Sequence, residues 1–252
     1  MADVRIERER GVVTIAFARP EKKNALTEAM YGAAADTLEA VAANDEDRVV
    51  LLTGDGGDFT AGNDISTFAA VAAGAVDLSN SQVGRFLRAI STFPKPIVAA
   101  VTGHAVGIGV TMLLHCDLVY VAEDATLRTP FVDLGLVPEA GSSRLLPARI
   151  GHVRAFALFA LGETMSGAEA VAAGLANRAL PAAEVQGVAR EAARTLAGKS
   201  ASSLAATKRL MRDSEAIARA IRADDEAFLA QLRTPEAAAA FAAFAARRQQ
   251  KG

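Results

Sequence analysis

Apolar residues follow two different periods along the chain, and together these periods predict a mixed α/β protein. Six short runs have the length and patterning of strands. They are Val4–Glu9, Val12–Phe17, Arg48–Thr53, Ile97–Val101, Leu118–Ala122 and Ala125–Arg128. The first two are joined across Gly11, which predicts a hairpin. Helical segments separate most of the later runs, which favours parallel pairing, and the repeated strand pairs favour a ββα unit over a simple βαβ unit.

Helical periodicity accounts for most of the remaining chain. Apolar residues recur every three or four positions from Met30 to Val41, after a candidate N-cap at Thr27. Other helices are expected over Val83–Thr92, over Val110–Cys116 and from near Ser142. From Ala155 onward the pattern is helical almost throughout. In that region a capping box starts at Ser166, and Thr234 precedes a proline at the first position of a final helix.

The amino-acid composition indicates which classes of molecule the protein is not expected to bind. The chain has 252 residues, of which 51% are hydrophobic and 22% charged, and its net charge is −2. This balance gives no reason to expect a nucleic-acid or membrane partner. Cys116 is the only cysteine, so an intrachain disulfide and a thiolate metal site are both excluded. A reducing, cytoplasmic location is the expectation.

Two glycine-containing loops, each after a buried strand, are the first candidates for chemistry. They are Phe59–Ile65 and Gly103–Gly109. Glycine lets the backbone approach a ligand closely, and the second loop leads into a helix N-terminus, where free N–H groups favour negative charge. Taken alone, each loop could be an ordinary turn.

Both loops, in this order, resemble those of the crotonase (enoyl-CoA hydratase/isomerase) superfamily. The resemblance extends over nearly the whole chain and includes Arg19–Leu26, Pro94–Val101, Cys116–Val119 and Leu134–Ser143. It implies an α/β fold in which a crotonase-like ββα spiral forms an acyl-CoA-binding core over residues 1–195. A C-terminal helical trimerisation region would follow over residues 196–252, in a homotrimer or a dimer of trimers.

The resemblance also implies which backbone groups hold the reacting oxygen. The family's oxyanion hole corresponds here to the N–H groups of Asn63 and Ile108. Removing a proton α to a thioester places negative charge on the carbonyl oxygen, and two preorganised donors stabilise that enolate.

The resemblance places the acyl-CoA thioester, the expected partner, along both loops. The residues implied in binding are Lys22, Asn24, Ala25, Leu26, Ala61, Gly62, Asp64, Ile65, Gly107, Phe131 and Leu134. Lys208 is a candidate for a phosphate contact or lies on a solvated helix face. The segment Phe68–Val76 is expected to shape the acyl tunnel. CoA is part of the substrate, and neither a cofactor nor a metal is expected.

Carboxylates decide which reaction such a site performs. Thr111 and Phe131 stand where the family's hydratases have glutamates, which argues against hydration because water addition needs a base and an acid. Glu139 resembles the single catalytic glutamate of the peroxisomal-type Δ3,Δ2-enoyl-CoA isomerases, and Asp133 is the other candidate. The expected activity is that isomerisation, in fatty-acid-type metabolism such as β-oxidation. Hydration, another crotonase-type lyase or hydrolase reaction, and an inactive acyl-CoA-binding homologue are the alternatives.

Overall fold

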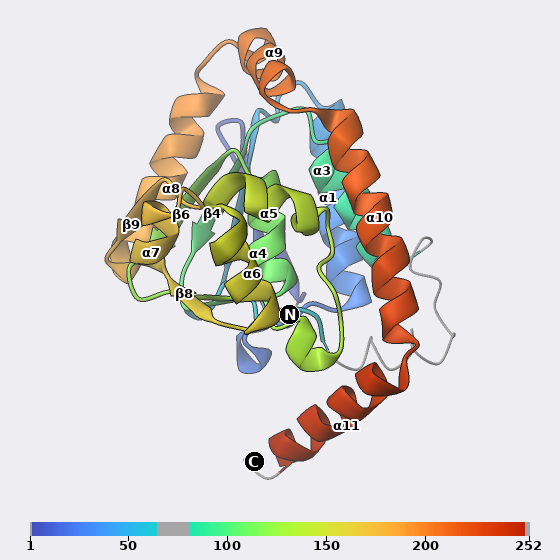
Figure 1. Ribbon diagram of the computed structural model, residues 1–252. Coiled ribbons are helices and arrows are strands. Elements are labelled where there is room, and N and C mark those ends of the chain that lie inside the picture. Colours follow the sequence, from blue (N-terminus) through green and yellow to red (C-terminus); the bar gives the residue numbers. More distant parts are fainter. Residues whose placement is uncertain (1, 65–80, 250–252) are drawn as a thin grey trace.

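The main body of the protein is a six-stranded sheet enclosed by helices (Figure 1). The computed structural model describes residues 2–64 and 81–249. In spatial order the strands are β1 (Val4–Glu9), β2 (Val12–Phe17), β3 (Val49–Gly54), β4 (Ile97–Val101), β6 (Leu118–Ala122) and β9 (Arg178–Leu180). β1 and β2 form the predicted antiparallel hairpin, and every later pair is parallel, which confirms the predicted pairing.

A second, three-stranded sheet contains β5 (His104–Val106), β7 (Thr126–Arg128) and β8 (Thr164–Ser166). β5 follows β4 after two residues, and β7 follows β6 after three, so each pair places one strand in each sheet. A single bridge from Thr60 to Ala105 adds the segment after β3 to the edge of this second sheet. The ββα unit predicted from the repeated strand pairs is confirmed.

Three strands were not predicted from the sequence. β5 lies in a segment interpreted as a glycine-punctuated turn, and β8 and β9 interrupt the region after Ala155 interpreted as almost wholly helical. Each has only three residues, which is too short for an alternating pattern to show. Tertiary pairing with neighbouring strands, rather than local preference, therefore determines their conformation.

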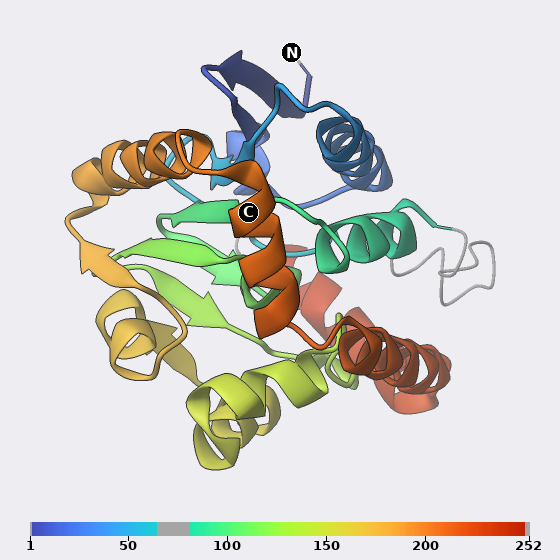
Figure 2. The ribbon, with the colours of Figure 1, turned by 90° about the horizontal axis from the view of Figure 1, so that it is seen from above.

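Helices cover both sides of the larger sheet. The α-helices of the described residues are α1 (Glu28–Ala43), α3 (Gln82–Ser91), α4 (Ile108–Thr111), α5 (Ser142–Ile150), α6 (His152–Ala160), α7 (Gly167–Ala172), α8 (Ala182–Ala197), α9 (Ala201–Met211), α10 (Ser214–Leu232) and α11 (Pro235–Gln249). α8 packs on β3, β4 and β6, while α1 packs on β1, β2 and α3. Figure 2 shows α8 and the α1–α3 pair on opposite sides of the strands. The helix expected over Val110–Cys116 is instead α4 followed by a 3₁₀ helix, Met112–His115.

The predicted helix starts have the expected caps. Thr27 accepts a hydrogen bond from the Met30 N–H, and Ser166 and Glu169 form the reciprocal capping box. The Thr234 hydroxyl accepts from the Ala237 N–H at the start of α11. Among residues 2–64 and 81–249 no helix is long and apolar enough to cross a bilayer.

The last three helices extend along the body. Figure 1 shows α9 at the top, α10 running down one side and α11 turning away below it. α10 packs against α5 and α3, and α11 contacts the 3₁₀ turn Val132–Leu134. The helical character predicted for this region is confirmed, whereas a boundary at residue 195 stays a prediction.

Lys208 in α9 is largely buried and bound to groups of the protein, so it does not lie on a solvated helix face. Its side chain is 10% exposed, and Nζ donates to the Lys95 carbonyl and to Asp117 Oδ2, each at 2.7 Å. Asp117 Oδ2 also accepts from the Ile97 N–H at 2.8 Å. The Lys208–Asp117 ion pair therefore links the N-terminal ends of β4 and β6.

Replacing Lys208 with Ala is expected to lower the free energy of unfolding by about 2 kcal/mol, because Asp117 then loses its buried counter-charge. Urea unfolding measures this loss, and acyl-CoA affinity should stay unchanged. Lys199→Ala, at an exposed site, is the control and should change stability by less than about 0.5 kcal/mol. Unchanged stability with weakened acyl-CoA binding would return Lys208 to a phosphate contact.

Candidate active site

The loop before α1 and the loop after β3 run side by side. The Ala61 N–H donates to the Lys23 carbonyl, the Leu26 N–H to the Gly62 carbonyl, and the Asp64 N–H to the Leu26 carbonyl, each at 2.8 Å. Residues 22–26 and 61–64, which the sequence placed along one acyl-CoA path, are therefore brought together. Ile65 and the segment Phe68–Val76 lie outside the described residues.

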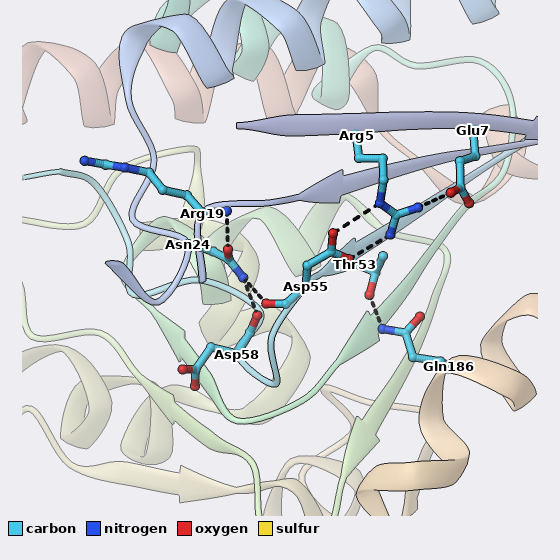
Figure 3. A network of polar contacts seen from close by, with 8 residues as sticks. All are labelled: Arg5, Glu7, Arg19, Asn24, Thr53, Asp55, Asp58 and Gln186. Atoms are coloured by element: carbon cyan, nitrogen blue, oxygen red, sulfur yellow. Dashed lines mark hydrogen bonds and ion pairs between the residues drawn. The ribbon is translucent and has the colours of Figure 1, made fainter. Parts of the chain in front are cut away.

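Asn24 fixes this arrangement through its buried side chain (Figure 3). Its amide nitrogen donates to the carbonyl groups of Asp55 and Asp58, at 2.8 and 2.6 Å. Its amide oxygen accepts from the Arg19 N–H at 2.8 Å. Asn24 also has φ of +55°, a left-handed conformation that asparagine tolerates better than most residues. Its side chain is thus occupied within the protein and holds the loop rather than facing a ligand.

The two glycine-containing loops meet through strand-like contacts. The Thr60 N–H donates to the His104 carbonyl at 2.9 Å, and the Val106 N–H donates to the Thr60 carbonyl at 3.1 Å. At Gly62, φ is +90°, and a Cβ atom would lie 2.8 Å from the Val106 carbonyl oxygen. Only glycine therefore lets the loops approach this closely.

The two expected donors, Asn63 and Ile108, face one small cavity. Within residues 2–64 and 81–249, neither backbone N–H has a hydrogen-bond acceptor. Ile108 is the first residue of α4, where helix geometry leaves N–H groups free. Gly107 before it has φ of +56° and ψ of −115°, which requires glycine, and its N–H is bound to the Arg128 carbonyl at 2.8 Å. The backbone at Gly107 is thus fixed, while the Ile108 N–H stays available to bind a ligand.

The cavity has a volume of about 100 Å³ and mostly apolar walls. Its lining residues are Ala61, Gly62, Asn63, Val106, Gly107, Ile108, Pro130, Phe131, Leu134, Leu136, Glu139 and Phe228. The apolar walls expected at Ile108, Phe131 and Leu134 are therefore present. Among the described lining residues Glu139 is the only carboxylate, so it shares an apolar cavity with the two residues whose N–H groups are free.

Glu139 is buried and is held by a hydrogen bond from a neighbouring helix. It is 8% exposed, and Oε1 accepts a short hydrogen bond from the Thr111 hydroxyl of α4. Burial raises the pKa of Glu139 to about 8, while the Thr111 hydrogen bond lowers it and the negative charges of Asp224 and Asp225 raise it further. A carboxyl group with a pKa near neutrality can both accept and return a proton.

Asp133, the other candidate carboxylate, lies at the surface. Arg128 Nη2 contacts Asp133 Oδ2 at 2.7 Å, and both side chains are almost half exposed. Asp133 is not among the residues that line the cavity. Of these two candidates, Glu139 is thus the carboxylate that lines the same cavity as Asn63 and Ile108.

The remaining residues expected to bind acyl-CoA differ in how accessible they are. Lys22 is exposed, Ala25 is half-buried and Leu26 is buried. Asp64 forms an ion pair with Arg19 at 2.7 Å, which leaves its carboxylate less available to a ligand. The side chains of Asn24 and Asp64 are therefore bound within the protein, and acyl-CoA binding along this segment stays a prediction.

Three residues of the site were missed from the sequence. Thr111 was considered only as the absence of a glutamate, yet its hydroxyl binds Glu139. Tyr31 of α1 donates a short hydrogen bond to Asn63 Oδ1 and fixes that side chain. Phe228 of α10 covers the cavity. No local pattern marks these three, because each reaches the site from a different element.

A larger cavity, of about 520 Å³, lies elsewhere, between α5, α9 and the start of α10. It contains neither the free N–H pair nor Glu139, so its size does not make it the reaction site. No group of three or more His, Cys, Asp or Glu side chains in the described part of the chain could hold a metal ion.

Comparison with known proteins gives the family. The model of the enoyl-CoA hydratase/isomerase family matches residues 7–251. The chain belongs to the enoyl-CoA hydratase/isomerase family. OdaA of Pseudomonas aeruginosa has 47% sequence identity and a TM-score of 0.93 over 97% of this chain and 99% of that one. The crotonase-like fold expected from the sequence, with its C-terminal helical region, is thereby confirmed.

Relatives within the enoyl-CoA hydratase/isomerase family perform different reactions. The chain is 35% identical to enoyl-CoA delta isomerase 2 of Rattus norvegicus, over 82% of this chain but only 54% of that protein. It is also 30% identical to 2,3-dehydroadipyl-CoA hydratase of Escherichia coli, over 86% of this chain and 85% of that one. Family membership therefore indicates an acyl-CoA enzyme and leaves the reaction to be argued from the site.

Proposed function

We propose that this protein is a Δ3,Δ2-enoyl-CoA isomerase in which Glu139 is the only acid–base group. The supporting observation is that Glu139, the only carboxylate among the described residues that line the cavity, shares it with Asn63 and Ile108, whose N–H groups have no acceptor within those described residues. Glu139 removes a proton from C2 of a 3-enoyl-CoA thioester, and the electron pair spreads over a dienolate whose oxygen is bound by the Asn63 and Ile108 N–H groups. Glu139 then returns the proton to C4. The double bond moves from C3–C4 to C2–C3, and no atom is gained or lost.

The site favours this reaction over hydration. Hydration requires one group to activate water and another to protonate carbon. Thr111 occupies one of the two positions concerned and donates to Glu139, while Phe131 occupies the other and packs against Phe159 at a ring-centroid distance of 5.9 Å. The proposed reaction uses CoA only as part of the substrate. A homotrimer or a dimer of trimers stays a prediction.

Incubation with trans-3-hexenoyl-CoA and, separately, with crotonyl-CoA tests the proposal. The expected result is 2-hexenoyl-CoA of unchanged mass and little hydration of crotonyl-CoA. Products heavier by one water, or free CoA, would replace isomerisation with hydration or hydrolysis. Acyl-CoA binding without any turnover would indicate an inactive homologue.

The rate is expected to rise with pH through about 8, because the base must be deprotonated and its pKa in the free protein is about 8. Thr111→Val removes a hydrogen bond that stabilises the carboxylate, so the pKa of Glu139 should rise further. The midpoint of kcat/KM against pH should then move up by about half a unit to one unit.

Thr37→Val is a matched control, since the Thr37 hydroxyl bonds only to the Ala33 carbonyl within α1. Its pH profile should equal that of the wild type. A Thr111→Val profile with an unchanged or lower midpoint would contradict the assignment of the titrating group to Glu139.

A further inference from the structure

The buried face of α10 contains one carboxylate among apolar side chains. Its buried residues are Ala216, Ile217, Ala220, Ile221, Asp224, Phe228 and Leu232. Asp224 is 4% exposed, and Phe228, one turn later, lines the reaction cavity. A buried acid on such a face needs hydrogen-bond donors, because burial disfavours its charge.

The donors come from the start of α5. Asp224 Oδ1 accepts a short hydrogen bond from the Ser143 hydroxyl, and Oδ2 accepts from the Ser143 N–H at 3.3 Å. Burial raises the pKa of Asp224, and the Ser143 hydroxyl and N–H, together with the nearby N–H groups of Gly141 and Ser142, lower it. α5 has glycine at its N-cap position and no cap from its own side chains. Asp224 therefore caps α5 from another helix.

The capped turn is the one that carries Glu139. The Ser142 N–H donates to the Glu139 carbonyl at 3.0 Å. Between them, Ala140 and Gly141 are both left-handed, with φ of +59° and +72°, a conformation that alanine rarely adopts. Contacts from outside the turn must therefore maintain it. Ile221 of α10 packs closely on Gly141, where an added Cβ atom would lie 3.1 Å from its side chain.

We propose that Asp224 is a positioning residue for Glu139, which it acts on by anchoring the turn between Glu139 and α5 and by adding a negative charge nearby. The inference rests on the proposed function in that Glu139 is taken as the base. It assigns to the C-terminal helix α10 a part in setting both the position and the proton affinity of that base.

The negative charge of Asp224 changes the pKa of Glu139 in a known direction. Asp224 and Asp225 both raise the pKa of Glu139, so loss of the Asp224 charge should lower it. Other elements also face this region. Their polar and titratable groups are Thr111 of α4, Tyr31 and Glu28 of α1, Arg88 of α3 beside Asp225, and His115, which bonds to the Ala140 carbonyl. Burial lowers the pKa of His115 to about 4, so that ring is neutral at the pH of the assay.

Asp224→Asn tests the inference because it keeps the side-chain shape and removes the charge. The midpoint of kcat/KM against pH should move down by about half a unit, and kcat should fall roughly tenfold as the turn loosens, with little change in KM. Glu226→Gln removes the same charge from an exposed position of α10 and should behave as wild type. A wild-type profile for Asp224→Asn would overturn the proposal.

Direct titration of Glu139 separates this inference from the proposed function. The carboxyl carbon of ¹³C-labelled Glu139 is assigned by its absence in Glu139→Gln and followed by NMR against pH. A lower pKa in Asp224→Asn than in Glu226→Gln supports the role of Asp224 even if the protein performs another reaction. Equal values exclude that role, whatever the activity.

Ser143→Ala decides the question if Asp224→Asn does not fold. This variant keeps the Asp224 charge and removes one of the hydrogen bonds that join Asp224 to the start of α5. A fall in kcat of several-fold without a lower midpoint supports positioning. Wild-type kcat would contradict it.

Discussion

Replacing Glu139 with Gln is expected to lower kcat for double-bond migration by about 10³-fold or more, with a small change in KM. The amide has nearly the shape of the carboxyl group but cannot accept the C2 proton, and general acid–base groups of this kind contribute about 10²–10⁴-fold. Steady-state formation of the 2-enoyl-CoA product measures the loss.

Asp133→Asn is the matched control for Glu139→Gln. Asp133 lies six residues earlier, on the surface beside Arg128, and an exposed ion pair contributes little to stability. Its kcat should stay within about twofold of wild type, since no group at the cavity changes. Similar losses in the two variants would mean that Glu139 is not the specific base.

Replacing Gly62 with Ala is expected to lower kcat by about 100-fold, although no side chain is removed from the site. A Cβ atom there would lie 2.8 Å from the Val106 carbonyl oxygen, so the two loops must separate. Separation displaces the Asn63 N–H from the enolate oxygen, and loss of one such donor typically costs about 10²–10³-fold in kcat. Single-turnover kinetics measure this effect on the chemical step.

Gly57→Ala controls for backbone strain. Gly57 has φ of +95°, much like Gly62, but an added Cβ atom meets nothing within 4 Å. It should lower stability to a similar extent and leave kcat near the wild-type value. If Gly57→Ala lowers kcat as much as Gly62→Ala, general strain rather than the oxyanion donor explains the loss.

The regular parts of the fold were predictable because their signals are local. β1, β2 and β4 have the predicted bounds, and Thr27 and Ser166 cap the helices that follow them. β5, β8 and β9 were not predictable, because their conformation depends on partners far away in the sequence. The interpretation of Lys208 as part of a solvated helix face was wrong for the same reason. On a helix its charge suggests solvent or a phosphate, and only the fold brings Asp117 against it.

The site was predictable where backbone groups make it. Asn63 and Ile108 were implied by the resemblance of two loops to the motifs of a known family, and the structure brings both to one cavity with Glu139. What was missed comes from distant elements. Thr111 was interpreted only as a lost glutamate, and Asp224 lies 85 residues beyond Glu139 in sequence, so no local pattern connects them.

The central claim is that the Glu139 carboxyl group alone moves a proton from C2 to C4 of the substrate. A 3-enoyl-CoA carrying deuterium at both C2 positions tests this under single-turnover conditions in ordinary water, with the product analysed by NMR and mass. The expected product is 2-enoyl-CoA in which a measurable share of molecules keeps both deuterium atoms, one at C2 and one at C4, because Glu139 holds the label in an apolar cavity. The remaining molecules should be lighter by one mass unit, since their transferred deuterium has exchanged with water. A product heavier by one water, or the same deuterium transfer in Glu139→Gln, would contradict it.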